Sequence, residues 1–294
     1  MDNLIYLFPF SNITDDEFSD LHMDMMLNMN QLNIRETIAP FNFKINDNNE
    51  ENKYVFGNGS IDPDANLYKN AHVNNDNSAY YTDYELNNNI KREKLKTDSF
   101  SIIHVNSRSL AAHFNQLTFM LSQINIDFDV IAITETWLDE YDTKTSLYQL
   151  ENYDMYSTSR KQKSGGGVIL YIKKSLEHKQ IPIMSLCSDD CLEAVGAQIK
   201  LPNNKKVIVG CVYRAPNSDI SLIEKYFSDI ANTIRNKTVY ICGDFNIDLL
   251  KYDSHALTNN FIDTLFGYGL HPLINRPTRI TSYSSTLIDN IFYN

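Results

Sequence analysis

The sequence lacks any long run of apolar residues. No stretch approaches the roughly 18 consecutive apolar residues of a membrane-spanning helix, so we expect no membrane segment. The N-terminus also lacks the basic region with which a secretory signal peptide begins, and the chain turns acidic by Asp15. These two absences predict an intracellular protein that is not secreted.

Cysteine is scarce, with four residues in a chain of 294. Cys211 and Cys242 lie inside apolar, strand-like runs and are expected to behave as small buried hydrophobic residues. Cys187 and Cys191 have the spacing of a metal clip, but no second cysteine or histidine pair at zinc spacing accompanies them. None of the seven histidines stands at a metal-ligand spacing from another. We therefore do not predict a zinc site.

Positive charge is in deficit, because 26 lysines and arginines face 37 aspartates and glutamates, a formal net charge of −11. Such a balance at first argues against a nucleic-acid partner. The excess is concentrated near the N-terminus, where residues 1–97 hold 16 of the acidic and 8 of the basic side chains. Residues 98–294 thus carry a net charge of only −3, which is compatible with a local basic face.

Residues 1–97 have the composition of a mostly disordered leader. They are acidic and rich in asparagine, with few aliphatic side chains between residues 42 and 90. One short helix is predicted there, because residues 14–17 form a capping-box pattern and the apolar residues that follow recur on one helical face. The charged run 91–96 is typical of a linker, so we place the start of the folded domain at residue 98.

From residue 98 onward, apolar β-rich runs and amphipathic helical patterns share the chain. Strand and helix alternate at first, but three strands with no long helix between them follow from residues 167 to 213. This mixture favours an α/β sandwich with mixed sheets over a doubly wound parallel sheet. The expected strands span residues 100–105, 128–133, 167–172, 194–199, 207–213, 238–242 and 286–292, and the expected helices span 110–124, 220–234 and 256–265.

Polar side chains stand where several of these strands end. Asp244 and Asn246 follow a strand that closes with Gly243, which lets the backbone turn sharply out of the sheet. Taken singly, such a residue more often caps a turn than takes part in chemistry. A consistent set at five strand ends is harder to explain by capping alone, and its members are Asn106, Glu135, Tyr213, the pair Asp244 and Asn246, and Asp289.

With their neighbours, these residues form motifs that resemble the endonuclease/exonuclease/phosphatase family. The resemblance covers roughly residues 100–294 and is nearest to the endonuclease domains of non-LTR (LINE-type) retrotransposons. It implies a four-layer α/β sandwich. The motifs are TETWL at 134–138, GGGV at 165–168, VYRAP at 212–216, GDFN at 243–246, RPTR at 276–279 and LID at 287–289.

The resemblance implies hydrolysis of phosphodiesters in DNA with Mg²⁺, or Mn²⁺, as the metal. It makes Glu135 the principal metal ligand with Asn106 beside it, which suits a cation that prefers oxygen donors. Asp244 would orient and deprotonate the attacking water, and Asn246 would help to hold that water and the phosphate. Tyr213 would donate a hydrogen bond to the phosphate as charge builds in the transition state.

The resemblance also implies DNA contacts around this set. Asp289 would support the hydrogen-bonded floor of the site, and Thr278 matches a position that contacts the phosphate or DNA. No small-molecule cofactor is implied, and action on chromosomal DNA would make the protein nuclear. The basic candidates for contacts to the DNA backbone are Arg108, Arg160, Lys161, Lys163, Arg214, Arg276 and Arg279.

Three of these features also have a purely structural interpretation. The basic run 160–163 is equally typical of a solvated hairpin tip. Trp137 is expected to pack beneath the metal-binding loop rather than to insert into DNA. The glycines 165–167 do not form a phosphate-binding loop, because no Lys-Ser/Thr pair follows them and they lead into a strand.

One motif on which the family depends is missing. The family closes its site with Ser-Asp-His on a loop before a last core strand, and no Ser-Asp-His occurs in these 294 residues; Asn290 also stands where the retroelement branch usually has histidine. The absence predicts impaired hydrolysis and an unpaired sheet edge where that strand would lie. Three alternatives stay open: an inactive remnant that binds nucleic acid or protein, another phosphoesterase of the family acting on abasic sites or phosphorylated lipids, and a fragment that does not fold.

Overall fold

The computed structural model describes residues 4–9, 80–92, 100–138, 143–161, 165–188, 191–281 and 283–294. The helix predicted after residue 14 and the side chain of Lys163 lie outside these residues. No helix in the described part of the chain is long and apolar enough to cross a membrane.

The first sheet joins parallel strands to an antiparallel pair, in the order β1-β2-β3-β5-β4. Helix α5 (Leu110–Gln123) connects β2 (Ser101–Asn106) to β3 (Val130–Thr134), and a helical crossover of this kind lets the two strands run parallel. Their carboxyl ends therefore lie side by side. β5 (Val168–Lys173) pairs antiparallel with β3, and β4 (Tyr153–Thr158) pairs antiparallel with β5.

The second sheet has seven strands, and its centre is built in the same way. Helix α6 (Ser221–Ile234) connects the parallel strands β9 (Lys206–Arg214) and β10 (Thr238–Asp244), and β14 (Asp289–Tyr293) runs antiparallel to β10. The outer strands are β8 (Leu192–Lys200), β6 (Glu177–Gln180) and β7 (Leu186–Ser188) on one side and β11 (His271–Pro272) on the other.

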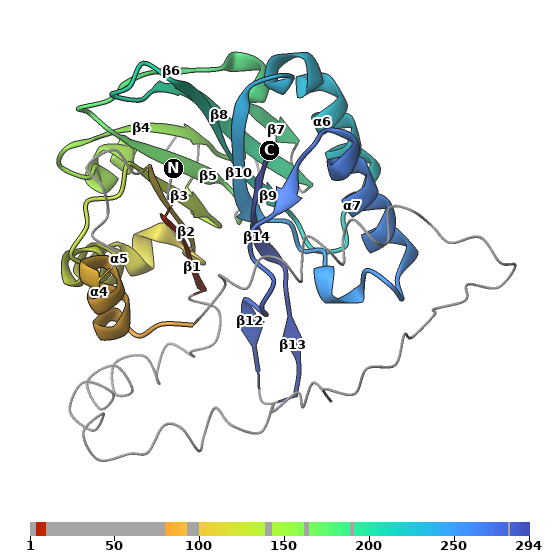
Figure 1. Cartoon of the computed structure of the whole chain (residues 1–294), viewed down its shortest axis with the longest axis horizontal. Helices are drawn as coiled ribbons and strands as arrows, with labels where there is room; N and C mark the ends of the chain where they lie inside the picture. Colours follow the sequence, from red (N-terminus) through yellow and green to blue (C-terminus); the bar gives the residue numbers. More distant parts are fainter. Residues whose placement is uncertain are drawn as a thin grey trace, which may run out of the picture. The chain divides into compact units, whose positions relative to one another are not determined.

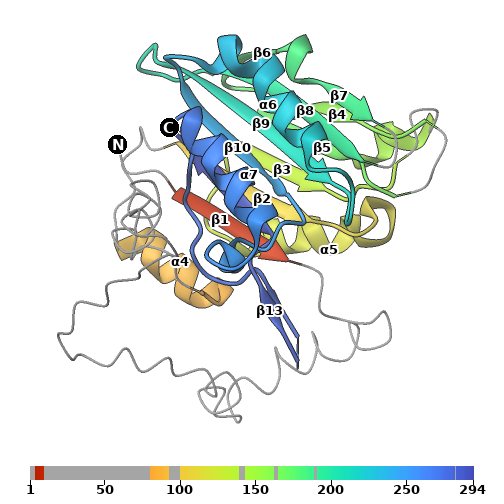
Figure 2. The same cartoon turned by 90° about the vertical axis from the view of Figure 1, so that its right-hand side faces the viewer.

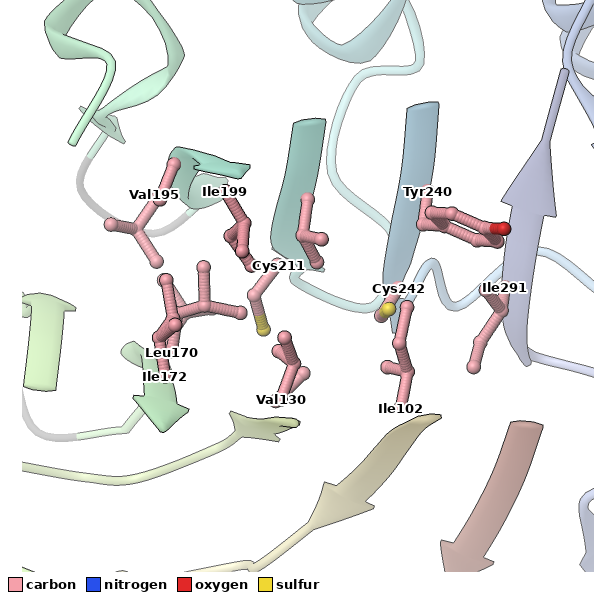
Figure 3. Packing of buried hydrophobic residues seen from close by; sticks show 14 of the residues in the cluster. Ile102, Val130, Leu170, Ile172, Val195, Ile199, Cys211, Tyr240, Cys242 and Ile291 are labelled. Atoms are coloured by element: carbon pink, nitrogen blue, oxygen red, sulfur yellow. The ribbon is translucent and has the colours of Figure 1, made fainter. Parts of the chain in front are cut away.

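The inner faces of the two sheets form the larger core (Figure 3). Ile102, Val130 and Leu170 of the first sheet meet Val195 and Cys211 of the second. The thiols of Cys211 and Cys242 are fully buried, and burial raises the pKa of both. The two cysteines are therefore apolar core residues, as the sequence predicts.

Helices cover the outer faces of both sheets, which gives the four layers helix, sheet, sheet, helix (Figures 1 and 2). α5 and α4 (Asp83–Arg92) lie on the first sheet, where Leu110 and Leu117 pack with Ile103 and Ile131. α6 and α7 (Ala256–Gly267) lie on the second, where the rings of Phe245, Phe261 and Phe292 make edge and tilted contacts. The short elements are the 3-10 turns Thr143–Tyr148, Pro182–Met184 and Leu249–Lys251 and the hairpin β12 (Arg279–Ile280) with β13 (Ser285–Thr286).

The N-terminal residues contribute a strand that the sequence did not predict. β1 (Leu4–Pro9) pairs in parallel with β2 over its whole length, from Leu4 opposite Ser101 to Pro9 opposite Asn106. The outer edge of β2 is thus paired through its backbone. β1 is itself the outermost described strand at this end of the first sheet, so the expectation of an open sheet edge stays a prediction.

Helix α4 also differs from the expectation of a leader that extends to residue 97. Its Leu86 is 1% exposed and belongs to the core under the first sheet. The Asn87 side chain donates to the carbonyl of Gln123 and accepts from the amide of Asn125, both at 2.7 Å. The compact unit therefore begins before residue 98, and α4 is part of it.

We expect Leu86→Ala to lower the free energy of unfolding by about 2–5 kcal/mol, since it removes a buried side chain and leaves a cavity. Tyr84→Ala is the matched control on the same helix, because Tyr84 is 76% exposed and its loss should change stability by less than about 0.5 kcal/mol. Urea unfolding of the full chain measures both. Equal stability of Leu86→Ala and wild type would show that α4 is not packed on the domain.

Candidate active site

Three backbone segments interlock where the strands of the first sheet end. The amides of Ser107, Ser109 and Leu110 donate to the carbonyls of residues 134, 135 and 136, each at 2.9 Å. On the other side, the Thr136 and Trp137 amides donate to the carbonyls of Gly167 and Gly166 at 3.3 and 2.9 Å. The backbone of Glu135 is therefore held between two neighbouring segments.

The same segments contain unusual backbone conformations. Glu135, Trp137 and Asn246 have φ values of 51°, 54° and 49°. Arg108 and Ser109 also have positive φ, at 43° and 96°. Every other described non-glycine residue with positive φ is an asparagine, which tolerates the left-handed region best. Such a conformation costs about 1–3 kcal/mol for other residues and typically persists at functional sites.

Asn106 joins two of the predicted acidic residues. Its Nδ2 donates to Glu135 Oε1 and to Asp244 Oδ2, both at 2.8 Å. Asp244 Oδ1 accepts from the amide of Asn246 at 3.0 Å. Asn106 and Asp244 are buried, at 5% and 1% exposure, whereas Glu135 is half-buried. The Asn106 side chain thus joins the strand ends of the first sheet to the end of β10 in the second sheet.

Asp289 completes the cluster from the neighbouring strand, where it lies opposite Asp244 in the β10–β14 register. Its Oδ2 accepts from the Thr278 hydroxyl at 2.8 Å. Its Oδ1 is buried and has no hydrogen-bond partner among the described residues. Thr278 is itself buried, so its hydroxyl supports Asp289 rather than facing solvent. Within the part of the chain that the structure describes, the cluster thus contains a carboxylate oxygen to which no group donates.

The ionisation of the two aspartates is affected by burial and by neighbouring carboxyl groups. Burial raises the pKa of Asp244 well above its usual range, and the charges of Asp289 and Glu135 raise it further. Burial and the charge of Glu135 raise the pKa of Asp289 to about 7, against the lowering effect of the Thr278 hydrogen bond and the Arg279 charge. Cationic charge added at this cluster would therefore be strongly stabilised.

Tyr213 and Arg214 lie on the same side of the cluster. Tyr213 is opposite Asp244 in the β9–β10 register, and burial together with the charges of Glu135 and Asp244 raises its pKa. The phenol therefore stays protonated and able to donate. Arg214 donates to the carbonyls of residues 245 and 246 at 3.3 Å each, and its own carbonyl accepts from Asn246 Nδ2 at 2.7 Å.

Several predicted surface contacts are placed differently. Arg160 and Arg214 are 6% and 7% exposed, so they are not placed to contact DNA, and Arg160 is not a solvated hairpin tip either. Trp137 is 45% exposed, which differs from the expectation that it packs beneath the metal-binding loop; its backbone is left-handed, with φ of 54°. The predicted basic residues that the structure leaves exposed are Arg108, Lys161, Arg276 and Arg279.

Two further positions were not predicted as part of the site. Glu193 is fully buried in β8 and forms an ion pair with Arg160. The sequence feature that could have identified it is a single acidic residue within an apolar run. The resemblance suggests histidine at position 290, where this chain has asparagine. Asn290 Oδ1 accepts from the Ile274 amide at 3.2 Å, and Asn290 Nδ2 donates to the Ile274 carbonyl at 2.8 Å. Asn290 therefore holds the segment that leads to Thr278 and is a structural residue.

The residues present fit a divalent cation. No described group of three or more His, Cys, Asp or Glu side chains forms a ready-made metal cage. Mg²⁺, however, usually takes only one or two carboxylates and completes its shell with water and phosphate oxygens. The half-buried Glu135, the raised pKa values of Asp244 and Asp289, and the unpartnered Asp289 Oδ1 are the features of a site that a cation would complete.

A sequence profile of the Endonuclease/Exonuclease/phosphatase family matches residues 104–294. The fold is similar to the endonuclease domain of TRAS1, a telomere-specific non-LTR retrotransposon, with a TM-score of 0.50, 15% identity, and coverage of 65% of this chain and 84% of that one. The AP endonuclease LMAP from Leishmania major has a TM-score of 0.48 and 15% identity, with coverage of 65% of this chain and 78% of that one. The 3' phosphatase NExo from Neisseria has a TM-score of 0.45 and 14% identity, with coverage of 65% of this chain and 85% of that one. No curated protein sequence matches the chain.

Proposed function

The chain belongs to the Endonuclease/Exonuclease/phosphatase family, and on that premise we propose that it hydrolyses phosphodiester bonds in DNA with Mg²⁺ or Mn²⁺ as its cofactor. In this proposal it is an endonuclease of the non-LTR retrotransposon type. The motifs at 134–138, 212–216 and 243–246 support that branch. Action on chromosomal DNA would place it in the nucleus.

One observation carries the proposal. Glu135, Asp244 and Asp289 lie at the ends of three strands of two different sheets. The first two accept from the Asn106 amide, and Asp289 lies opposite Asp244 with an Oδ1 that has no partner among the described residues. Mutual repulsion makes such a cluster unfavourable without a cation. A fold gains nothing in stability from this arrangement, so we infer that it serves chemistry.

Each residue then has a role that its contacts support. Glu135 would hold the cation, with Asn106 beside it fixing the carboxylate. When bound, a divalent cation would neutralise charge on the phosphate and on the departing oxygen. Asp244 is fixed by two hydrogen bonds and would take the proton of the attacking water, which Asn246 helps to place. The neutral Tyr213 phenol would donate to a phosphate oxygen.

DNA is the substrate class that the exposed cations favour. Arg108 lies in the short segment between β2 and α5, and Arg279 begins the β12–β13 hairpin next to Thr278. The charge of Arg279 reaches Asp289, so this arginine lies near the cluster. Cations that flank an acidic site in this way can hold the phosphates on either side of the bond that is cut.

A second candidate function is DNA binding without cleavage. The observation that favours it is Asp289 Oδ1, which has no donor among the described residues. A missing donor of that kind would weaken stabilisation of the transition state and leave binding intact.

Cleavage assays on the full chain separate the candidates. We expect Mg²⁺- or Mn²⁺-dependent nicking of supercoiled plasmid, abolished by EDTA, and slower release of phosphate from phosphorylated inositol. Faster turnover of an abasic duplex than of intact plasmid would assign a different activity within the family. DNA binding by gel shift with no nicking at any metal concentration would support the second candidate.

A further inference from the structure

A buried ion pair lies behind the site and takes no direct part in the chemistry described above. Arg160 Nε donates to Glu193 Oε1 at 2.6 Å, and Arg160 Nη2 donates to Glu193 Oε2 at 3.3 Å. The side chains are 7% and 0% exposed. Burying both charges requires desolvation that a hydrophobic pair of similar volume would avoid, so stability alone is a weak reason for it.

The pair lies against Tyr213. Glu193 is directly opposite Tyr213 in the β8–β9 register, and the Arg160 guanidinium carbon lies 5.9 Å from the centroid of the Tyr213 ring. A guanidinium at this distance over a tyrosine face is attracted by the ring. Because the pair fixes the guanidinium, it also restricts the tilt of the ring and hence the position of the phenol hydroxyl.

The pair also touches the triglycine segment 165–167. Glu193 Oε2 accepts from the amide of Gly167 at 3.3 Å. A Cβ at Gly166 would lie 2.5 Å from both Arg160 Nε and Glu193 Oε2, and the backbone there has φ of +63°. Glycine is therefore required at position 166 because the ion pair occupies the space of a side chain, not because a phosphate binds there.

The triglycine segment in turn holds the loop of Glu135. The carbonyls of Gly166 and Gly167 accept from the amides of Trp137 and Thr136, the two residues that follow Glu135. One carboxylate, that of Glu193, is thus linked to Glu135 through a chain of backbone hydrogen bonds. The same carboxylate is linked to Tyr213 through Arg160.

We propose that Arg160 and Glu193 are positioning residues that set the Glu135 carboxylate and the Tyr213 hydroxyl at a fixed separation across the bound phosphate. This inference rests on the proposed function, because it assigns both groups to the same phosphate ester. Two reacting groups on separate loops gain rate only when their geometry is held, and a displacement of about 1 Å can cost on the order of 100-fold. An ion pair with directional hydrogen bonds fixes both loops where an apolar pair would fix neither.

The test is Glu193→Gln in the full chain, which keeps the shape of the side chain and removes its charge. We expect kcat for plasmid nicking to fall about 10- to 100-fold with little change in KM, since DNA contacts are untouched. Trp137, the single tryptophan, lies two residues from Glu135 and reports on its loop. Titration of its fluorescence with Mg²⁺ should give a weaker half-saturation in the variant.

Glu177→Gln is the matched control, because Glu177 forms an exposed ion pair with Lys200 at 2.8 Å on an outer strand. It should leave kcat and the Trp137 titration unchanged. If Glu193→Gln lowers the melting temperature but leaves both readouts as in wild type, the pair is structural only and the proposal is overturned.

Arg160→Lys covers the case in which Glu193→Gln does not fold, since it keeps the charge and removes the planar fork. The same loss of kcat and Mg²⁺ response is expected, and an unchanged Arg160→Lys overturns the proposal. If the wild type cleaves nothing, the proposed function fails. The Trp137 titration then still decides whether the ion pair controls the Glu135 loop.

Discussion

The Asp244→Asn variant is expected to nick DNA about 10³-fold more slowly than the wild type. The amide has nearly the shape of the carboxylate but cannot take a proton from the attacking water. Asp244 is 1% exposed and fixed by Asn106 and the Asn246 amide, so no other side chain can move into its place without rebuilding the loop. The measurement is kcat at saturating Mg²⁺ on supercoiled plasmid, with the melting temperature of each variant recorded alongside.

Asp248→Asn is the matched control for this substitution. Asp248 lies four residues further along the same loop, where its Oδ1 accepts from the amides of Leu250 and Leu287 at 3.3 and 3.0 Å. Its loss can affect folding but touches none of the residues around Asn106. We expect kcat within about twofold of wild type per folded molecule. Nicking by Asp244→Asn at the wild-type rate would remove Asp244 from the mechanism.

The strands that carry the site could be predicted because they are buried on both faces. The apolar runs 207–213 and 238–242 are continuous, and they became β9 and β10 almost to the residue. The polar strand-end residues could be predicted as a set for the same reason, since each interrupts such a run. β4 and β6 were missed because they are polar edge strands, with alternating or mostly exposed side chains.

The positions of the charged residues could not be predicted in the same way. A lone arginine is usually a surface residue, and only a partner from another strand can bury it. Arg160 is buried because β8 brings Glu193 to it, and Arg214 because the 245–246 carbonyls surround it. Trp137 was misplaced since a positive φ at an aromatic residue has no sequence signature. Pairing between distant segments decided where the two arginines lie.

The second large effect is the loss, as pH rises, of the stability that Asp289 contributes to the metal-free protein. Asp289 has its pKa raised from 3.8 in the unfolded chain to about 7 in the fold, chiefly by burial. Between these pH values the folded state binds more protons than the unfolded state. The contribution of Asp289 to stability is therefore full below about pH 4 and is lost as pH rises to about 7. The buried His104, whose pKa is lowered to about 3, contributes in the opposite direction up to its ordinary value of 6.5, so the effect of Asp289 is measured as a difference between variants.

Asp289→Asn should remove most of this loss. The asparagine Oδ1 can still accept from Thr278, and its Nδ2 would occupy the position of the unpartnered oxygen, where it faces carboxylates instead of repelling them. We expect the variant to be more stable than the wild type at pH 7.5 in EDTA and about equal to it at pH 4.5. Urea unfolding at a series of pH values measures this, and Asp248→Asn, outside the cluster, should keep the wild-type slope.

Bound Mg²⁺ should restore part of the stability that is lost when Asp289 ionises. A cation that binds only the folded state stabilises it in proportion to its occupancy, and it offsets the repulsion that the ionised Asp289 adds to Asp244. Saturating Mg²⁺ is therefore expected to raise the melting temperature of the wild type at pH 7.5 and to raise that of Asp289→Asn less. A stability difference between the wild type and Asp289→Asn that is the same at pH 4.5 and at pH 7.5 in EDTA would contradict the buried, proton-retaining Asp289. The carboxyl cluster would then be an ordinary solvated one, and the argument that a cation completes it would lose its electrostatic basis.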